Sequence, residues 1–360
     1  MKKTFVCLLM MLSLAMLTQC THVTFSSPLQ KTTGDLPALV SPGEHSLKLE
    51  ILDNRPVKDL YAGGLSHIDS GVFIAYSADP GSDTLAQYLE KTGIEASQLL
   101  GFKAGPGGGA LKVTVNDFWI DLYRFSGFSP MNCIGYGTLT VDFSAGPGQP
   151  TRSSNLKMAY YENTTPAWSM EEVPREAMSR IYSQTIWETV GKTLRENGSP
   201  PVDPKAVERL VQMVDAETDD RIARELIFWL GLVGRDDPRA REKLLQIFRN
   251  TQEQRRRQGA VEALGMLGIQ EARADIVDIL SENRKIGYWS NNDAEEVFYL
   301  IKALAYLGEK DLQAFIPKQD FRARTKVQEL VAFLNTGAIP EPHPKARPLL
   351  EEVKEELKRK

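Results

Sequence analysis

The sequence predicts an α+β domain followed by an all-α domain of helical repeats, both placed after an N-terminal export segment. Three observations lead to this prediction. A thirteen-residue apolar run lies near the N-terminus, residues 46–200 alternate strand-like runs with two amphipathic helices, and a glycine-terminated phrase of small and apolar residues recurs three times after residue 200. With 360 residues, the chain is long enough for two folded units.

The N-terminal segment has the pattern of a secretory signal peptide. Lys2 and Lys3 supply positive charge, and the apolar run from Phe5 to Leu17 follows them. At about 1.5 Å per helical residue this run is too short for a hydrocarbon core of about 30 Å, but it has the length of a signal-peptide core. We therefore expect residues 1–19 to be removed on export.

The end of this segment, Leu17-Thr18-Gln19-Cys20, resembles the lipobox of bacterial lipoproteins, although Gln19 stands where Gly, Ala or Ser is usual. The resemblance implies cleavage before Cys20 and a membrane anchor of palmitate-type acyl chains on that thiol. Thr21 is not the Asp that retains enteric lipoproteins in the inner membrane, so the periplasmic face of the outer membrane is the expected location. The alternative is an ordinary signal peptide with a chance cysteine near its end.

Charge and cysteine content limit the classes of function. The formal net charge is −4, and the loss of Lys2 and Lys3 with the signal peptide leaves −6. Such a chain lacks the positive field that attracts nucleic acid, so we expect no nucleic-acid partner. Once Cys7 is cleaved off and Cys20 is lipidated, Cys133 cannot form an intrachain disulfide, and we expect it to be a small buried hydrophobe.

Residues 20–45 are rich in Ser, Thr, Pro and Gly and predict a flexible tether. Residues 46–200 then predict an antiparallel sheet covered on one face by two helices. The first helix is expected to start at Asp79 or Ser82 and to stop at Gly93, and a β-bulge is expected near Asn116-Asp117. The expected strands are 46–52, 71–77, 110–125, 133–144 and 154–161, and the expected helices are 79–91 and 171–197.

This order of elements resembles the YajG-like envelope lipoproteins. In them a strand that ends in an Asp-x-Arg segment, here Leu52-Asp53-Asn54-Arg55-Pro56, precedes a helix and a long meander. The resemblance covers roughly 150 residues and rests on the pattern and this one motif. It implies an envelope protein that binds or helps to assemble other proteins, and no known chemistry.

Residues 201–336 predict helical repeats whose phrases end at Gly234, Gly268 and Gly308. The intervals of 34 and 40 residues lie in or near the range of helical solenoids. Ala263-Leu264-Gly265-Met266-Leu267-Gly268 closely resembles the end of the second helix in short bacterial HEAT repeats. The resemblance implies three helix pairs plus a half repeat, stacked as a solenoid, with the terminal glycines supplying the turns. Residues 337–360 predict a Pro-rich spacer and a charged C-terminal helix, which we expect to be loose rather than docked on the solenoid.

No pattern of catalytic or metal-binding residues stands out. The glycines at 105–109 lack the Gly-Lys-Ser/Thr ending of a phosphate-binding loop, so we interpret them as a turn. Asp53, His67 and Asp69 are close in sequence, but without a metal-ligand spacing we expect solvated loop residues. The prediction is therefore a protein that is not an enzyme, with no catalytic residue, no metal site and no cofactor.

Two surface features are candidates for partner binding. Arg255, Arg256 and Arg257 start a repeat helix, where they form either a solvated face or a docking site for an acidic partner. The longer second interval places Tyr288 and Trp289 in an inserted loop, where they either pack back or bind a partner.

These features together predict a lipid-anchored envelope protein that acts in protein–protein interaction or assembly, with envelope proteins and the membrane as partners. Two alternatives remain open. One is an enzyme, similar to lyase-type proteins with HEAT repeats, or a small-ligand-binding protein that uses the cleft between the two domains. The other is a purely structural spacer.

Overall fold

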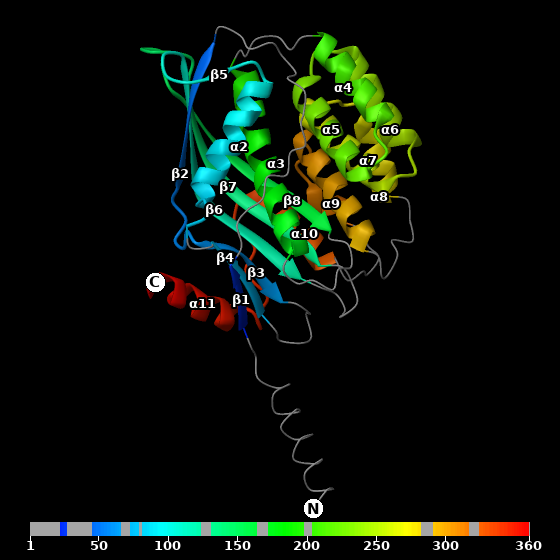
Figure 1. The fold of residues 1–360 in the computed structure, drawn as a ribbon. Coiled ribbons are helices and arrows are strands. Elements are labelled where there is room, and N and C mark those ends of the chain that lie inside the picture. Colours follow the sequence, from blue (N-terminus) through cyan, green and yellow to red (C-terminus); the bar gives the residue numbers. More distant parts are fainter. Residues whose placement is uncertain are drawn as a thin grey trace, which may run out of the picture.

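The computed structural model describes residues 22–26, 45–65, 73–78, 81–123, 131–163, 172–197, 204–281, 291–316 and 324–359. It has an α+β N-terminal region followed by helices (Figure 1). Residues 1–19, which we expect to be a signal peptide, and Cys20 lie outside the described part of the chain. Among the described residues, no helix has the length and apolar character needed to cross a membrane.

The N-terminal region is built on one mixed sheet of eight strands. Neighbouring strands follow the order β1-β4-β3-β6-β2-β5, and β7 and β8 extend the sheet from the other edge of β6. The strands are β1 (His22–Ser26), β2 (Ser46–Asp53), β3 (Leu60–Leu65), β4 (Phe73–Ser77), β5 (Lys103–Ala104), β6 (Gly109–Tyr123), β7 (Asn132–Ser144) and β8 (Arg152–Asn163).

The prediction of an antiparallel sheet is only partly correct. Strands β6, β7 and β8 are antiparallel, but β2 and β6 are parallel, and so are β3 and β6. The segment between β2 and β6 includes a helix, and a long connection of this kind can place the two strands in parallel. Alternation along a strand reports which residues share a face, not the direction of the neighbouring strand. The expected bulge is confirmed by a register shift between Val115 and Asp117.

Part of the predicted tether is a strand. β1 lies within residues 20–45 and pairs in parallel with β4, from His22 opposite Phe73 to Ser26 opposite Ser77. The segment His-Val-Thr-Phe-Ser alternates polar and apolar residues and includes β-branched ones, which favours an edge strand over a solvated tether. The sheet therefore begins two residues after Cys20.

One face of the sheet is covered by α2 (Leu85–Leu99) and α3 (Glu172–Glu196). α2 begins after Thr84, whose side chain forms a capping box with Gln87, instead of after Asp79 or Ser82. α2 also runs through Gly93. A Cβ atom at Gly93 would lie 2.6 Å from Leu49 Cδ2, so this glycine permits close packing of the helix on the sheet and does not end the helix.

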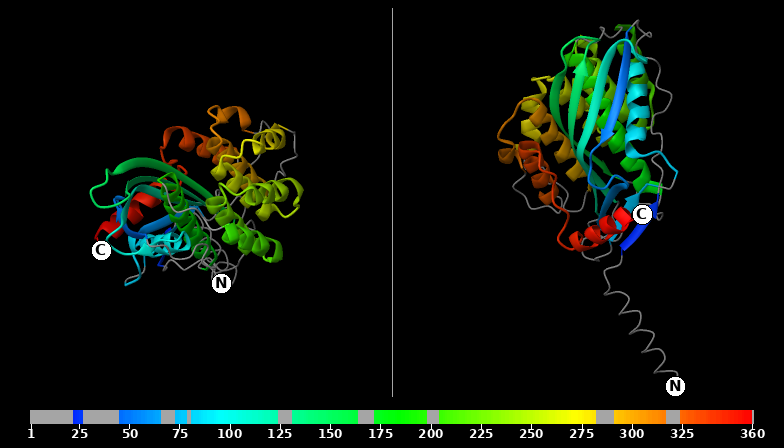
Figure 2. Two further views of the ribbon diagram at one scale, coloured as in Figure 1. Left: turned by 90° about the horizontal axis from the view of Figure 1, so that it is seen from above. Right: turned by 90° about the vertical axis from the view of Figure 1, so that its left-hand side faces the viewer.

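Two C-terminal helices, α10 (Arg324–Thr336) and α11 (Arg347–Arg359), cover part of the opposite face of the sheet. Tyr136 of β7 packs against Phe333 of α10, with ring centroids 5.1 Å apart. α11 buries Leu349, Leu350 and Val353 in a small core with residues of β3 and β4, and Figure 2 shows it across the end of the sheet that holds β1. The expectation of a loose C-terminal helix is thus wrong, because its apolar stripe has a partner on the sheet.

The remaining helices form antiparallel pairs. Their second members, α5, α7 and α9, pack on one another in that order, and α9 packs on α10. The helices are α4 (Pro204–Ala216) with α5 (Asp220–Val233), α6 (Pro238–Asn250) with α7 (Gln254–Leu267), and α8 (Ala272–Ser281) with α9 (Asn291–Tyr306); η1 (Leu312–Phe315) precedes α10.

Glycines allow these helices to approach closely. A Cβ atom at Gly231 would lie 2.6 Å from Ala263 Cβ, and one at Gly265 would lie 2.8 Å from Ala303 Cα. Gly268 and Gly308 have φ of 70° and 87°, as the prediction of glycine turns requires. Gly234 differs, since its φ is −87°. Its lack of a side chain instead makes room for a following helix.

Candidate binding site between the sheet region and the helix pairs

The structure describes only some of the residues that the sequence predicts to form functional sites. Cys20, Tyr288 and Trp289 lie outside them, as do His67 and Asp69. Nothing in the structure therefore tests the lipidation site or the two aromatic residues in the inserted loop.

Arg255, Arg256 and Arg257 are described, and each contacts another part of the chain. Arg256 Nε lies 2.7 Å from a carboxylate oxygen of Asp220, and Arg257 Nε lies 2.9 Å from one of Glu296. Arg255 donates a 3.4 Å hydrogen bond to the carbonyl oxygen at the end of β8. All three are half-buried, so they join α7 to its neighbours and are not a fully solvated face. Their role in binding a partner stays a prediction.

Asp53 is not a solvated loop residue, contrary to expectation. Its carboxylate is almost fully buried and forms a 2.8 Å ion pair with Arg55. Arg55 also donates hydrogen bonds to the carbonyl oxygens of Lys58 and Leu60. The Asp-x-Arg motif therefore fixes the turn between β2 and β3. Within the ranges that the structure describes, no cluster of three or more His, Cys, Asp or Glu residues could hold a metal ion.

The glycine-rich segment and Cys133 have the structural roles that were expected. Gly105 and Gly107 have positive φ in the turn before β6, and Gly108 packs against the backbone of Ser46. Cys133 is completely buried on β7.

Buried charges join the helix pairs to the sheet region. Lys302 on α9 has no exposed surface, and Glu262 on α7 is 1% exposed. Their side chains form a 2.6 Å ion pair, and Lys302 Nζ also lies 3.7 Å from Glu188 on α3. Glu188 accepts hydrogen bonds from the hydroxyl groups of Tyr160 and Tyr306. Burial raises the pKa of Glu262, and the charge of Lys302 opposes that rise.

A second buried ionic cluster lies on the same boundary between the helix pairs and the sheet region, which we call the seam. Arg224 on α5 is 4% exposed and lies 3.0 Å from Glu295 on α9 and 3.3 Å from Glu162 on β8. The guanidinium also stacks over the ring of Tyr299, 4.8 Å from its centroid. Burial raises the pKa of Glu295 to about 7, with Arg224 opposing the shift. The two clusters hold α5, α7 and α9 firmly against α3 and β8.

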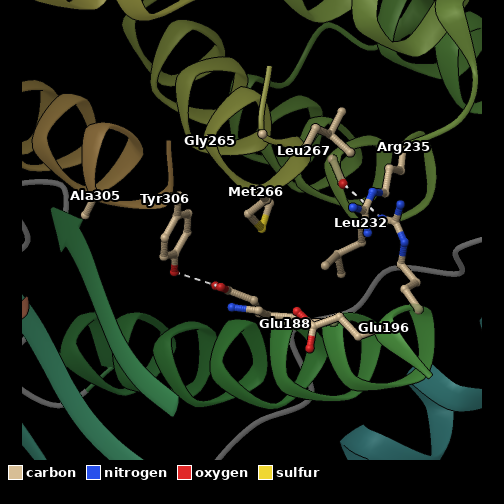
Figure 3. A pocket seen from close by; sticks show the side chains of 13 residues that line it. Glu188, Glu196, Leu232, Arg235, Gly265, Met266, Leu267, Ala305 and Tyr306 are labelled. Carbon is tan, nitrogen blue, oxygen red and sulfur yellow. Dashed lines mark hydrogen bonds between the residues drawn. The ribbon is translucent and has the colours of Figure 1, made fainter. Parts of the chain in front are cut away.

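A pocket of about 380 Å³ opens on this seam, between α3 and the C-terminal ends of α5, α7 and α9 (Figure 3). This volume lies within the range of pockets that bind small molecules, roughly 300–1,000 Å³. Glu188 and Tyr306 lie at one end, where the Tyr306 hydroxyl donates a 2.7 Å hydrogen bond to the carboxylate. Its lining is Glu188, Lys192, Arg195, Glu196, Gly231, Leu232, Arg235, Gly265, Met266, Leu267, Gly268, Ala305 and Tyr306.

Sequence reasoning named a cleft between the two domains only as an alternative, and it missed the buried charges and the residues that line the pocket. A signal was present, because Phe228, Glu262 and Lys302 occupy the same position in the three aligned repeat phrases. Opposite charges at equivalent positions of neighbouring repeats indicate an ion pair between stacked helices. Glu188 lies more than 70 residues before Glu262 in the sequence, outside the repeat phrases. Its place beside Lys302 therefore could not be predicted from the alignment of the repeats.

Comparisons with known proteins add only a weak link. No protein-family model matches the chain, and no curated protein matches it significantly. A crystal structure of a Xanthomonas campestris protein of the family model DUF330 has 16% identity and a TM-score of 0.30, covering 48% of this chain and 95% of that one. A crystal structure of a protein described as uncharacterized has 12% identity and a TM-score of 0.24, covering 49% of this chain and 97% of that one. Neither likeness carries an argument about function.

Proposed function

We propose that this chain is a lipid-anchored protein of the bacterial cell envelope that acts by binding or assembling another envelope protein. The signal-peptide pattern of residues 1–19 and the lipobox-like sequence before Cys20 support the anchor. The observation that carries the proposal is that β1 starts at His22 and pairs with β4. The sheet itself would therefore begin beside the acylated cysteine.

This arrangement sets the geometry of the anchor. One residue separates Cys20 from β1, and an extended residue spans at most about 3.6 Å. Acyl chains on Cys20 would hold one end of the sheet close to the lipid surface, namely the end where β1, β4 and α11 lie. The helix pairs would then lie along the side of the sheet (Figures 1 and 2). Because Thr21 is not Asp, we propose the periplasmic face of the outer membrane.

We propose further that the helix pairs form a short solenoid of the HEAT type. The order of contacts α5–α7–α9 and the contact of α4 with α6 support this proposal. Among the second helices, α5 packs on α3 and α9 packs on β8, so a protein partner would dock on the row formed by α4, α6 and α8. The repeated 34- and 40-residue intervals are consistent with stacked units that bind through extended surfaces.

Crosslinking in intact envelopes, followed by mass spectrometry, tests the binding proposal. We expect one envelope protein to be captured reproducibly by the wild type and to be lost in Cys20→Ala. Replacement of Tyr288 and Trp289 together by Ala should weaken this capture with little change in melting temperature if these side chains bind the partner. A large fall in melting temperature would assign them to packing, and absence of any captured protein would favour the structural spacer.

The seam pocket favours a second candidate function, a protein that binds a small ligand between its two regions. General acid–base catalysis would need a buried carboxylate or imidazole that is free to exchange a proton with a substrate. Glu188, the buried carboxylate at this pocket, is instead occupied by Tyr160, Tyr306 and Lys302. Binding is therefore the better-supported use of the pocket.

A further inference from the structure

We propose that the seam pocket binds a small organic anion in which a carboxylate or phosphate group is joined to an apolar group. This inference rests on the second candidate function and names its ligand class. It is independent of the membrane anchor and of the protein partner, so it can fail while both of those proposals stand.

Three cations line the pocket, and among the described residues none of them forms an ion pair. They are Lys192 and Arg195 on α3 and Arg235, which follows α5. Arg195 is half-buried, and its guanidinium donates a long hydrogen bond of 3.5 Å to the carbonyl oxygen of Gly231. A partly buried guanidinium without a carboxylate partner is costly to desolvate and gains strongly from a bound anion.

Arg195 and Arg235 line the same pocket and are close enough for their charges to interact. Burial lowers the pKa of Arg195 to about 10, and the positive charge of Arg235 lowers it further than Asp236 restores it. Arg195 and Arg235 therefore bring two positive charges close together in the pocket. The end of α5 contributes a partial negative charge of roughly one half, which is smaller than the two full charges of the arginine pair.

The acidic residues that line the pocket are Glu188 and Glu196. The Glu188 oxygens accept hydrogen bonds from Tyr160 and Tyr306 and lie near Lys302. Glu196 is exposed to solvent and forms no ion pair among the described residues. Among the described residues, an anion at the arginines would therefore displace no carboxylate that is ion-paired with them.

The wall beside the cations is apolar. Leu232 from α5 and Met266 and Leu267 from α7 line it, and Figure 3 shows Leu232 and Met266 between Arg235 and Tyr306. A methionine side chain adapts to ligands of irregular shape. The combination selects a ligand that has an anionic head near the arginines and a compact apolar group against Leu232 and Met266.

Isothermal titration calorimetry of the purified full chain tests the proposal with three probes. N-acetyl-L-leucine carries the carboxylate and the apolar group, N-acetyl-L-leucinamide lacks the charge, and inorganic phosphate lacks the apolar group. We expect saturable binding of the acid, and binding of the amide weaker by about tenfold to a hundredfold, as loss of a charge-assisted hydrogen bond predicts.

Arg195→Gln and Arg235→Gln should each weaken binding of N-acetyl-L-leucine by about tenfold or more. Arg209→Gln is the matched control, because Arg209 is an exposed arginine on α4 outside the pocket; its affinity should equal that of the wild type. Melting temperatures verify the fold, and neither pocket variant should lower them, because neither arginine forms an ion pair among the described residues.

Four results would overturn the inference. They are no binding of the acid at millimolar concentration, equal binding of the acid and the amide, unchanged affinity in both pocket variants, and phosphate binding as tight as that of the acid. The last result would identify a free inorganic anion as the ligand and remove the need for the apolar wall.

Discussion

Lys302→Met is the sharpest perturbation of the seam, because methionine keeps the apolar length of the side chain and removes the charge. Lys302 Nζ lies 2.6 Å from Glu262, 3.7 Å from Glu188 and 3.6 Å from the centroid of the Tyr160 ring. Both carboxylates are at most 3% exposed. The variant therefore leaves two buried acidic groups without their shared cation.

The expected cost follows from this geometry. Removing one partner of a buried ion pair destabilises a protein by about 3–5 kcal/mol, since the remaining charge is desolvated without compensation. Adding Glu262→Gln to Lys302→Met removes one of the two orphaned charges, and we expect it to recover about 2 kcal/mol or more. Glu188 keeps its hydrogen bonds from Tyr160 and Tyr306 in both variants.

Urea unfolding at pH 7 and pH 5, followed by circular dichroism and tryptophan fluorescence, measures both effects. Trp187 and Trp229 lie on α3 and α5 with ring centroids 5.3 Å apart. They are two of the five tryptophans of the chain, so part of the fluorescence signal reports on the seam. Loss of Lys302 should raise the pKa of Glu262 further, so the variant should lose less stability at pH 5, where this carboxyl is protonated, than at pH 7. A loss below about 1 kcal/mol at pH 7, or a double variant no more stable than the single one, would refute the reasoning.

Three further predictions concern stability. Burial raises the pKa of Glu225 from 4.5 to about 7, so the folded state holds a proton that the unfolded chain releases and stability falls as pH rises through that window; Glu225→Gln should make the urea midpoint fall less steeply between pH 5 and pH 8, with Glu295 still contributing to the slope, and a profile parallel to the wild type would contradict this. Gly265→Ala should cost about 1–3 kcal/mol in a thermal melt, because its Cβ would lie 2.8 Å from the backbone of α9, whereas Gly146→Ala, with nothing within 4 Å, should change nothing. Thr84→Ala removes the capping box of α2 and should lower the free energy of unfolding by about 1 kcal/mol in urea; an unchanged midpoint would show that the cap is dispensable.

Local patterns in the sequence predicted the elements that depend on them. Alternation in β6 and β7 located both strands and the bulge after Val115, and the glycine-terminated phrases located α5, α7 and α9. These features are encoded within a few residues of one another. Periodicity therefore recovers them without knowledge of the tertiary fold.

Features that depend on a distant partner were missed. The parallel pairing of β2 with β6 depends on the path of the chain between them, and the docking of α11 depends on an apolar surface of β3 and β4. Likewise, the apolar stripe of α11 was visible in the sequence, but the surface that receives it lies almost 300 residues earlier. The seam pocket combines α3 with the ends of three later helices, so no single stretch of sequence encodes it.

Acylation of Cys20 is the most direct test of the central claim. Cells grown with an alkyne-tagged palmitate should incorporate the label into the wild type and into Cys133→Ala, a control at a buried cysteine, but not into Cys20→Ala. Mass spectrometry of the labelled protein should find residue 20 as the N-terminus, in the membrane fraction. An unlabelled wild-type protein in the soluble fraction that retains residues 1–19 would contradict the account.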